Sequence, residues 1–432
     1  MLKNILSKIL PSPLRGGSII FIAVIMLFAG CASGLRVNSA VSLNREKLLL
    51  STEGGNSEIL YYSNTVLSHW LPGKEAPFGE IVSLDLLNDG AVLAITEKNG
   101  IVVFPDAQGK PVHLAIDDNK LPDHRIRNTC LYQFGKIKKL YVTYYSPGGT
   151  GVTECTIKNN WKDITYNTLN RNGSGLRSNY VHQVVPDIRG NIWFRYSASK
   201  KEGVSRLNLK GEWDHFDRRN SELGDNGVIL IRPEKRGMGQ DGDNIWFVSG
   251  AGLSRLQYRG KKENWKLFGD KSNVIDTMAR AIGIQSWFTD AIVDIVDIEI
   301  LDDAILIANK EAIYHFKGKN INRFLPETTG GINEHRIFDI KFRAGTIIAK
   351  IHSEYEPDPR VRSVMLFDLE KRRWKKLEYF HLANQFPRNI YFIPYNEKQD
   401  FVVLKYVSGP SRLAIFDYVT GGLREIKPSF ER

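Results

Sequence analysis

The residues most able to bind a ligand precede short apolar runs at four places in the chain. Two of these places read Asp123-His124-Arg125-Ile126 and Glu334-His335-Arg336-Ile337, and the other two read Asn179-Tyr180 and Arg388-Asn389. Arginine and histidine donate several hydrogen bonds, and guanidinium groups bind carboxylates and phosphates well. We predict that these side chains converge on a central concave surface and bind an anionic ligand. The alternative is that they are solvated loop residues or hydrogen-bond the ends of strands. The predicted site contains His124, Arg125, Asn179, Tyr180, His335, Arg336 and Arg388.

Sequence patterns of catalytic and metal sites are absent or occur in the wrong context. The chain has no His-Glu-x-x-His, no His-x-His and no Gly-x-Ser-x-Gly. Residues 237–242 match Gly-x-Gly-x-x-Gly, but a phosphate-binding turn of this type precedes a helix and here a strand is expected. Asp241-Gly242-Asp243-Asn244 offers too few oxygen ligands for calcium and is expected to form a hairpin turn. We predict no catalytic residue, no metal and no cofactor.

The elements that must position these residues are read from an internal repeat. One passage contains Gly190-Asn191-Ile192-Trp193-Phe194 followed by Gly203-Val204-Ser205-Arg206-Leu207. A later passage contains Asp243-Asn244-Ile245-Trp246-Phe247 followed by Gly252-Leu253-Ser254-Arg255-Leu256. Each copy consists of short β-type runs separated by turn residues, which is typical of a repeat architecture.

A bulky apolar residue near the start of the last run of each unit indicates how often the unit recurs. These residues are Val112, Trp161, Trp213, Trp265, Ile321, Trp374 and Leu423. Four antiparallel strands in each unit of about 50 residues are typical of a propeller blade. We therefore predict an all-β fold, a seven-bladed β-propeller of four-stranded antiparallel blades over residues 57–432. The recurring tryptophans are expected to pack between blades.

The passage Asp187-Ile188-Arg189-Gly190-Asn191-Ile192-Trp193-Phe194, followed by Gly203-Val204-Ser205-Arg206-Leu207, resembles the two-component-regulator propeller repeat. That family forms the periplasmic sensor portion of certain hybrid histidine kinases and also occurs in free-standing exported proteins. The second copy has Asp243 where the family has glycine, so its turn is expected to differ. The resemblance implies the propeller fold and, as one interpretation, a sensor subunit for a separate kinase.

The first thirty residues resemble a bacterial lipoprotein signal peptide. A basic start precedes the apolar run Ile19 to Phe28, and Leu27-Phe28-Ala29-Gly30-Cys31 resembles a lipobox. This resemblance implies cleavage before Cys31 and lipidation of its sulfur, whereas an ordinary cleaved signal or an uncleaved anchor is the alternative. Ala32 in place of aspartate favours the outer membrane, facing the periplasm or the cell surface. Residues 31–56, rich in Ser, Asn and Gly, are expected to form a flexible tether.

Three local features extend the predicted fold. Residues 58–71 contain a strand-like run that is expected to add to the last blade or to cover the point where the ring closes. Residues 272–282 have apolar residues at helical spacing and predict a short helix inserted between two blades. Cys130 and Cys155 are expected on the first and third strands of one blade, about 9–10 Å apart, which is too far for a disulfide.

The charge balance limits the class of partner. The formal net charge is +11, but no long Lys/Arg run interleaved with aromatic residues is present, so no nucleic-acid partner is expected. We predict membrane lipid bound through Cys31 and, as ligand or partner, an envelope protein, a glycan or a small anionic molecule. The predicted function is a ligand-binding or protein-interaction module, acting as sensor or scaffold at the cell envelope. The alternative is a propeller enzyme, a lyase or glycoside hydrolase with its site at the same central face.

Overall fold

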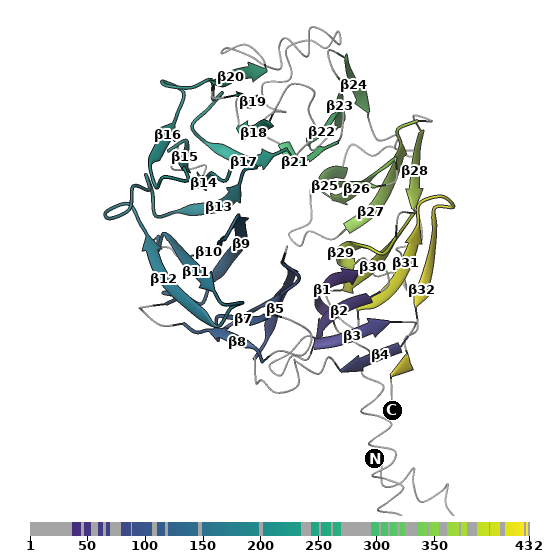
Figure 1. The fold of residues 1–432 in the computed structure, drawn as a ribbon. Coiled ribbons are helices and arrows are strands. Elements are labelled where there is room, and N and C mark those ends of the chain that lie inside the picture. Colours follow the sequence, from purple (N-terminus) through teal and green to yellow (C-terminus); the bar gives the residue numbers. More distant parts are fainter. Residues whose placement is uncertain are drawn as a thin grey trace, which may run out of the picture.

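A computed structural model describes most of the chain between residues 37 and 430. Residues 1–36, 53–58, 70–78, 235–242, 269–294, 325–334, 354–360, 378–386 and shorter gaps of one to four residues lie outside the description. The described strands form eight sheets arranged around a common axis, with the first strand of each sheet nearest that axis (Figure 1), and all strand pairs but one are antiparallel. The described residues contain no α-helix, and therefore no helix long and apolar enough to cross a membrane.

The first four sheets in chain order lie between residues 37 and 216, apart from the added strand β33. Their strands are β1 (Val37–Asn44), β2 (Lys47–Thr52), β3 (Ile59–Ser63) and β4 (Val66–His69); β5 (Ile81–Leu86), β6 (Val92–Thr96), β7 (Ile101–Phe104) and β8 (Val112–Leu114); β9 (Ile126–Phe134), β10 (Ile137–Tyr144), β11 (Val152–Lys158) and β12 (Asp163–Leu169); β13 (Val181–Pro186), β14 (Ile192–Tyr196), β15 (Val204–Leu207) and β16 (Trp213–Phe216). The next sheet consists of β17 (Val228–Pro233), β18 (Asp243–Ser249), β19 (Gly252–Arg259) and β20 (Lys262–Phe268), and it also ends before residue 270. The first sheet is thus additional to four of the predicted units.

The remaining sheets repeat the same plan. Their strands are β21 (Ile295–Ile300), β22 (Ile305–Asn309), β23 (Ile313–Lys317) and β24 (Asn320–Phe324); β25 (His335–Arg343), β26 (Thr346–Ser353), β27 (Val361–Asp368) and β28 (Arg373–Leu377); β29 (Pro387–Pro394), β30 (Gln399–Tyr406), β31 (Arg412–Asp417) and β32 (Gly422–Ile426). The last strand, β33 (Ser429–Phe430), pairs in parallel with β4 and so joins the first sheet.

A glycine before the third strand explains one of the recurring sequence signals. Gly100, Gly151 and Gly203 occupy this place in three successive sheets with φ of 82°, 86° and 74°. A Cβ atom on these glycines would lie 2.1–2.3 Å from a carbonyl oxygen of the fourth strand or of its end. Only glycine adopts this backbone conformation without strain and leaves room for the neighbouring strand. The position therefore closes each hairpin tightly.

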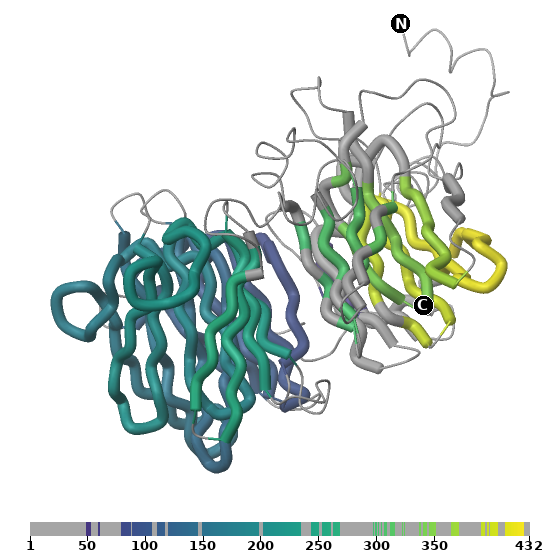
Figure 2. Tube along the Cα trace, turned by 90° about the horizontal axis from the view of Figure 1, so that it is seen from above, coloured from purple at the N-terminus to yellow at the C-terminus, as the bar shows by residue number. Residues whose placement is uncertain are grey.

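Apolar side chains on both faces of the sheets form the core. Seven hydrophobic clusters of described residues each combine two sheets, and together they follow the chain around the ring. Between the sheets β17–β20 and β21–β24 the described contact is an ion pair instead, with 3.6 Å between Arg232 Nη2 and Asp297 Oδ1. Seen from above, the sheets drawn blue to teal and those drawn green to yellow form two groups (Figure 2). Sheets that are covered on both faces explain why apolar runs without alternation form strands here.

The predicted repeat is confirmed, but the predicted number of seven blades is wrong. All seven predicted units are four-stranded sheets, and an eighth, five-stranded sheet is formed by β1–β4 and β33. Leu50 and Leu60 of this sheet pack on the last sheet, while Leu49 and Ile59 pack on the sheet β5–β8. The sheet therefore lies where the ring closes, as expected for residues 58–71. Residues 31–56, expected to be a flexible tether, instead contain β1 and β2, because Leu49 and Leu50 of β2 are fully buried and β2 pairs with both β1 and β3.

The predictions for the cysteines and for two of the tryptophans are confirmed. Cys130 and Cys155 lie on the first and third strands of one sheet and are both free, as expected. Burial raises the pKa of each thiol to about 12. Trp161 and Trp193 are fully buried in clusters between sheets, which confirms the packing role for these two tryptophans. The predicted signal peptide, the lipidation site Cys31 and the predicted helix at 272–282 lie outside the described residues.

Candidate functional site

Each sheet has a β-bulge near the start of its first strand. The pairing between the first and second strands skips one residue of the first strand in all eight sheets. The skipped residues, in chain order, are Asn38, Val82, Arg127, His182, Ile229, Val296, Phe338 and Arg388. Because the first strands surround the axis in Figure 1, these residues form a ring of backbone positions, which we call the bulge ring.

A bulge releases one residue from the alternation that packing imposes on a strand. The extra residue is left out of the pairing, and its side chain is redirected. Val82 illustrates the effect, because it is 47% exposed although the preceding Ile81 is fully buried. The described side chains of the bulge ring are those of Val82, Arg127, His182 and Ile229, and each is at least partly exposed. The bulge ring therefore presents side chains that the sheets do not need for their own packing.

Two neighbouring bulge residues and a residue of the adjoining strand form a cluster of basic groups. Arg127 lies on β9, His182 lies on β13, and Arg195 lies on β14 opposite Gln183, the residue after the bulge. Burial, followed by the charges of Arg127 and Arg195, lowers the pKa of His182 to about 4. Burial and the charge of Arg127 lower the pKa of Arg195 to about 10. The three groups are thus close enough to repel one another, and we call them the basic cluster.

The two arginines of the basic cluster keep hydrogen-bond donors without a described acceptor. The Nε atoms of Arg127 and Arg195 are both buried and have no hydrogen-bond partner within the described part of the chain. Arg195 Nη1 donates only two long bonds of 3.5 Å, to the carbonyl oxygens of Tyr196 and Val228. The guanidinium carbon of Arg127 lies 4.0 Å from the ring centroid of Tyr145, which is 54% exposed. Neither arginine forms an ion pair with an acid among the described residues.

The predicted site residues His124 and Arg125 lie just before β9, and Arg125 is already paired. Arg125 Nε and Nη2 donate to the two carboxylate oxygens of Asp123 at 3.1 and 2.9 Å. This hydrogen bonding lowers the pKa of the Asp123 carboxyl group. The His124 side chain is 54% exposed. Both predicted residues lie beside the start of β9, but the charge of Arg125 is compensated locally.

Asn179 and Tyr180 lie just before β13 and support a neighbouring loop. Asn179 Oδ1 accepts a hydrogen bond of 2.7 Å from the backbone N–H of Arg171, and its carbonyl oxygen accepts one of 3.0 Å from Gly151. A Cβ atom on Gly149 would lie only 2.9 Å from Asn179 Cβ and 3.2 Å from the Tyr180 ring. These contacts agree with the alternative interpretation, in which such residues are loop residues or hydrogen-bond the ends of strands. They also join the sheet β9–β12 to the residues just before β13, whose second residue is His182.

The other predicted residues lie on later sheets. His335 and Arg336 are the first two residues of β25, and Arg388 is the skipped residue of β29. Only their backbone is described. The structure therefore places all seven predicted residues at or just before the starts of first strands. Arg127, His182 and Arg195 were missed because they lie within strands, where the sequence pattern gives no sign of a bulge.

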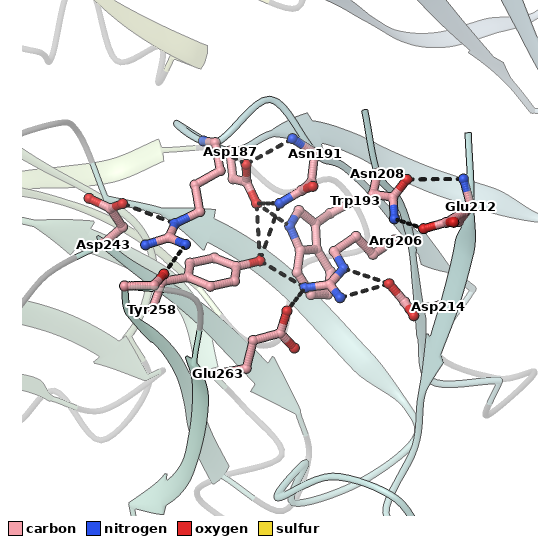
Figure 3. A network of polar contacts seen from close by, with 12 residues as sticks. Asp187, Asn191, Trp193, Arg206, Asn208, Glu212, Asp214, Asp243, Tyr258 and Glu263 are labelled. Carbon is pink, nitrogen blue, oxygen red and sulfur yellow. Dashed lines mark hydrogen bonds and ion pairs between the residues drawn. The ribbon is translucent and has the colours of Figure 1, made fainter. Parts of the chain in front are cut away.

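The opposite end of the sheet β13–β16 carries a second group of charged residues, the Asp187 network (Figure 3). Asp187 Oδ1 accepts the backbone N–H groups of Arg189 and Asn191, both at 2.9 Å. Asp187 Oδ2 accepts Asn191 Nδ2 at 2.8 Å, Trp193 Nε1 at 2.9 Å and the Tyr258 hydroxyl at 3.3 Å. The repeat signal Asp-x-x-Gly-Asn-x-Trp is thus a hydrogen-bonded turn that orients the buried tryptophan.

The arginines of the Asp187 network are paired with acids of two sheets. Arg206 donates two bonds to Asp214 Oδ2, at 3.0 and 2.7 Å, and it also binds Glu263 and the Tyr258 hydroxyl. Arg189 Nε donates to Asp243 Oδ2 at 3.2 Å, and its guanidinium carbon lies 4.3 Å from the centroid of the Tyr258 ring. Asp243, Tyr258 and Glu263 belong to the next sheet, so this network joins two sheets and has a structural role.

The described residues show no group of three or more His, Cys, Asp or Glu residues that could hold a metal ion. The candidate site consists of the basic cluster and the exposed Tyr145. These groups can attract and hydrogen-bond an anion, and the tyrosine ring can stack on a planar or apolar part of a ligand.

Comparisons with solved structures give matches at low sequence identity. Dihydro-heme d1 dehydrogenase NirN, in complex with DHE, aligns with a TM-score of 0.51 and 11% identity over 90% of this chain and 75% of that one. AztD from Citrobacter koseri aligns with a TM-score of 0.46 and 10% identity over 89% of this chain and 93% of that one. At this identity the similarity shows the fold alone.

Extracellular domains of two-component systems from B. thetaiotaomicron are also among the matches. One of them, from a hybrid system, aligns with a TM-score of 0.42 and 11% identity over 91% of this chain and 65% of that domain. This chain therefore spans less than two thirds of the length of that domain. No protein-family model matches the chain, and a search of the curated proteins finds no match.

Proposed function

We propose that this chain is a recognition module that binds a ligand at the bulge ring without covalent chemistry. The supporting observation is the contrast between two neighbouring positions of the first strands. The residues just before the bulges are Val37, Ile81, Ile126, Val181, Val228, Ile295, Ile337 and Pro387. All of these are apolar, as packing between sheets favours, whereas the residues at the bulges are two arginines, two valines, asparagine, histidine, isoleucine and phenylalanine. Varied chemistry at equivalent positions is typical of a site that reads a ligand.

The location of the module is part of the proposal. The lipobox resemblance at Cys31 and the apolar run before it support export and lipid anchoring, with the outer membrane as the destination. The propeller structures among the matches, which include extracellular domains of two-component systems, are compatible with an exported protein. Under this proposal the ligand is a small molecule or glycan of the cell envelope, and a separate envelope protein receives the signal.

An enzyme at the same face would require carboxylates that exchange protons during the reaction. Asp123 lies at the start of a first strand, but Arg125 binds both of its oxygens and holds its carboxyl pKa below the usual range. A carboxylate held in this way is a weak base. This observation favours recognition over hydrolysis or elimination at the start of β9.

The proposal can be tested by capture from envelope extract. The full-length lipidated protein, immobilised and washed, is expected to retain a small molecule or glycan that mass spectrometry identifies. A variant with Val82→Trp and Ile229→Trp, which adds bulk at two described bulge positions, is expected to lose that ligand while keeping its melting temperature. Retention of the same ligand by this variant, or no retained ligand in the wild type, would contradict recognition at the bulge ring.

Anchoring is tested separately. Metabolic labelling with a fatty-acid analogue is expected to label the wild type and to fail with Cys31→Ala. Label on the Cys31→Ala protein would exclude Cys31 as the lipidated residue, and it would leave the proposal about the bulge ring unaffected.

A further inference from the structure

We propose that Arg127, His182 and Arg195 form a site for the oxyanion of a ligand, namely a carboxylate, phosphate or sulfate group. The inference rests on the proposed recognition function and specifies which chemical group the described arc of the bulge ring binds. The three residues come from two adjacent sheets, and two of them are consecutive members of the bulge ring.

The first argument concerns unsatisfied hydrogen-bond donors. A buried donor without an acceptor destabilises the folded protein, and such groups are rare in native proteins. The basic cluster contains two of them, the Nε atoms of Arg127 and Arg195, within the part of the chain that the structure describes. An oxyanion is the ligand that satisfies arginine donors best, because its oxygens accept from Nε and from a terminal nitrogen together.

The second argument concerns charge. Each of the arginines Arg125, Arg189 and Arg206 has a carboxylate partner close by, whereas Arg127 and Arg195 have none among the described residues. Like charges that repel one another in a partly buried site disfavour the ligand-free state. A bound anion removes this repulsion, and the relief of the repulsion between the basic groups favours binding.

The third argument concerns what surrounds the anion. Tyr145 is 54% exposed and lies under the guanidinium group of Arg127, so one face of the site is aromatic. A ligand that carries an anionic group on a planar or ring-shaped body fits this combination better than an inorganic ion alone.

The site also predicts how binding depends on pH. In the free protein burial, followed by the charges of the two arginines, lowers the pKa of His182 to about 4 and so keeps the ring neutral at neutral pH. An anion between these groups favours the protonated ring, so binding takes up a proton at a pH below the ordinary histidine value of 6.5. Affinity for an anion of constant charge should therefore rise as the pH falls from 7.5 to 5.

The test uses the full-length protein and three probes at constant ionic strength: sodium sulfate, inorganic phosphate and sodium acetate. Isothermal titration calorimetry is expected to detect saturable sulfate or phosphate binding to the wild type. The variant Arg127→Gln/Arg195→Gln is expected to bind at least about tenfold more weakly, because both charge-assisted donors are lost. The matched control is Arg218→Gln/Arg424→Gln, which removes the same charge from two exposed arginines and should stay within about twofold of the wild type.

The outcomes separate this inference from the proposed function. Equal weakening in the matched control would mean general electrostatic attraction and would overturn the oxyanion site. No saturable binding of any probe to the wild type would overturn it as well, even if capture from extract retains a neutral ligand at the bulge ring. Capture of an acidic protein in place of a small anion would also overturn it.

The pH dependence gives a second readout that a merely structural role of these residues would not change. Sulfate affinity is expected to rise from pH 7.5 to pH 5 in the wild type and to become nearly flat in His182→Gln. An unchanged slope in His182→Gln would exclude His182 from the site. If the ligand from envelope extract is then identified, sulfate is expected to displace it. A ligand that sulfate does not displace would not bind through the oxyanion site.

Discussion

Arginines at the two ends of the sheet β13–β16 differ in whether they have a carboxylate partner. At one end, in the Asp187 network, Arg189 and Arg206 are paired with carboxylates of their own and the next sheet. At the other end, in the basic cluster, Arg127 and Arg195 keep buried donors without a described acceptor. Both ends hold arginine near an aromatic ring, so residue type does not distinguish them. The difference lies in whether the protein itself supplies the acid.

This difference indicates what each end contributes. Satisfied and partly buried charges fix the contact between two sheets, and their removal leaves partners without hydrogen bonds. Unsatisfied charges weaken the free protein slightly and gain energy only when an anion arrives. The Asp187 network should therefore control stability, and the basic cluster should control binding. The following predictions test this difference.

The largest effect is expected for Asp187→Asn. Asp187 is 7% exposed, and its two oxygens accept from two backbone and three side-chain groups. An amide keeps the shape but turns an NH2 group toward donors such as Trp193 Nε1. We expect the free energy of unfolding to fall by about 3 kcal/mol, measured by urea denaturation followed by tryptophan fluorescence.

Asp214→Asn is the matched control for this change. Asp214 binds Arg206, but its side chain is 42% exposed, so the loss should be at most about 1 kcal/mol. Similar losses in both variants would show that burial of the carboxylate is not what makes the Asp187 network important. The comparison between the two ends would then lose its physical basis.

The fold could be predicted from sequence because it depends on local patterns that repeat. Glycine before the third strand in three sheets, tryptophan on the second strand in two, and turns between short apolar runs each follow from a backbone or packing requirement that recurs along the chain. The eighth sheet could not be predicted in this way. It combines Val37–His69 with Ser429–Phe430, and the parallel pairing of β33 with β4 brings together residues from the two ends of the chain. No local pattern specifies that pairing.

The site could be predicted only in its general position. The starts of the first strands were identified, and Arg125, Asn179 and Tyr180 lie there, but these residues have partners of their own. Whether a side chain is free depends on the register shift one or two residues further on. Because a bulge changes the side-chain parity by one residue, alternation along β9 or β13 does not reveal that Arg127 and His182 are the released residues.

A second prediction makes the same substitution at both ends. Arg127→Gln/Arg195→Gln should leave the free energy of unfolding unchanged within about 1 kcal/mol or raise it, because two repelling charges are removed. Arg206→Gln should lower it by about 2 kcal/mol, since Asp214, Glu263 and Tyr258 lose a shared partner. Urea denaturation of the three proteins at one pH and salt concentration checks the pair. A large loss in the double variant would assign a structural role to the basic cluster.

The smallest expected effect concerns pH and His182. Its pKa is about 4 in the folded protein, whereas the ordinary value of 6.5 applies to the unfolded chain. Between these values the unfolded chain binds a proton that the folded chain does not, so stability should be constant above pH 6.5 and fall as the pH decreases toward 4. His182→Gln should lose less stability than the wild type between pH 7.5 and pH 5, measured as the shift in the urea midpoint.

The carboxyl group of Asp217 changes the stability of the protein in a lower pH range than His182 does, so the two contributions can be separated. Hydrogen bonds from Arg219 lower the pKa of Asp217 below its ordinary value of 3.8, so the stability contributed by this carboxylate is lost only at a pH below that value. The pKa of His215 is also lowered by burial, but His215 is present in both proteins and cancels in their difference. Adding sulfate should reduce the difference between wild type and His182→Gln at pH 5, because a bound anion stabilises the protonated ring. A difference that is unaffected by sulfate would mean that His182 is buried for packing alone and that the oxyanion lies elsewhere.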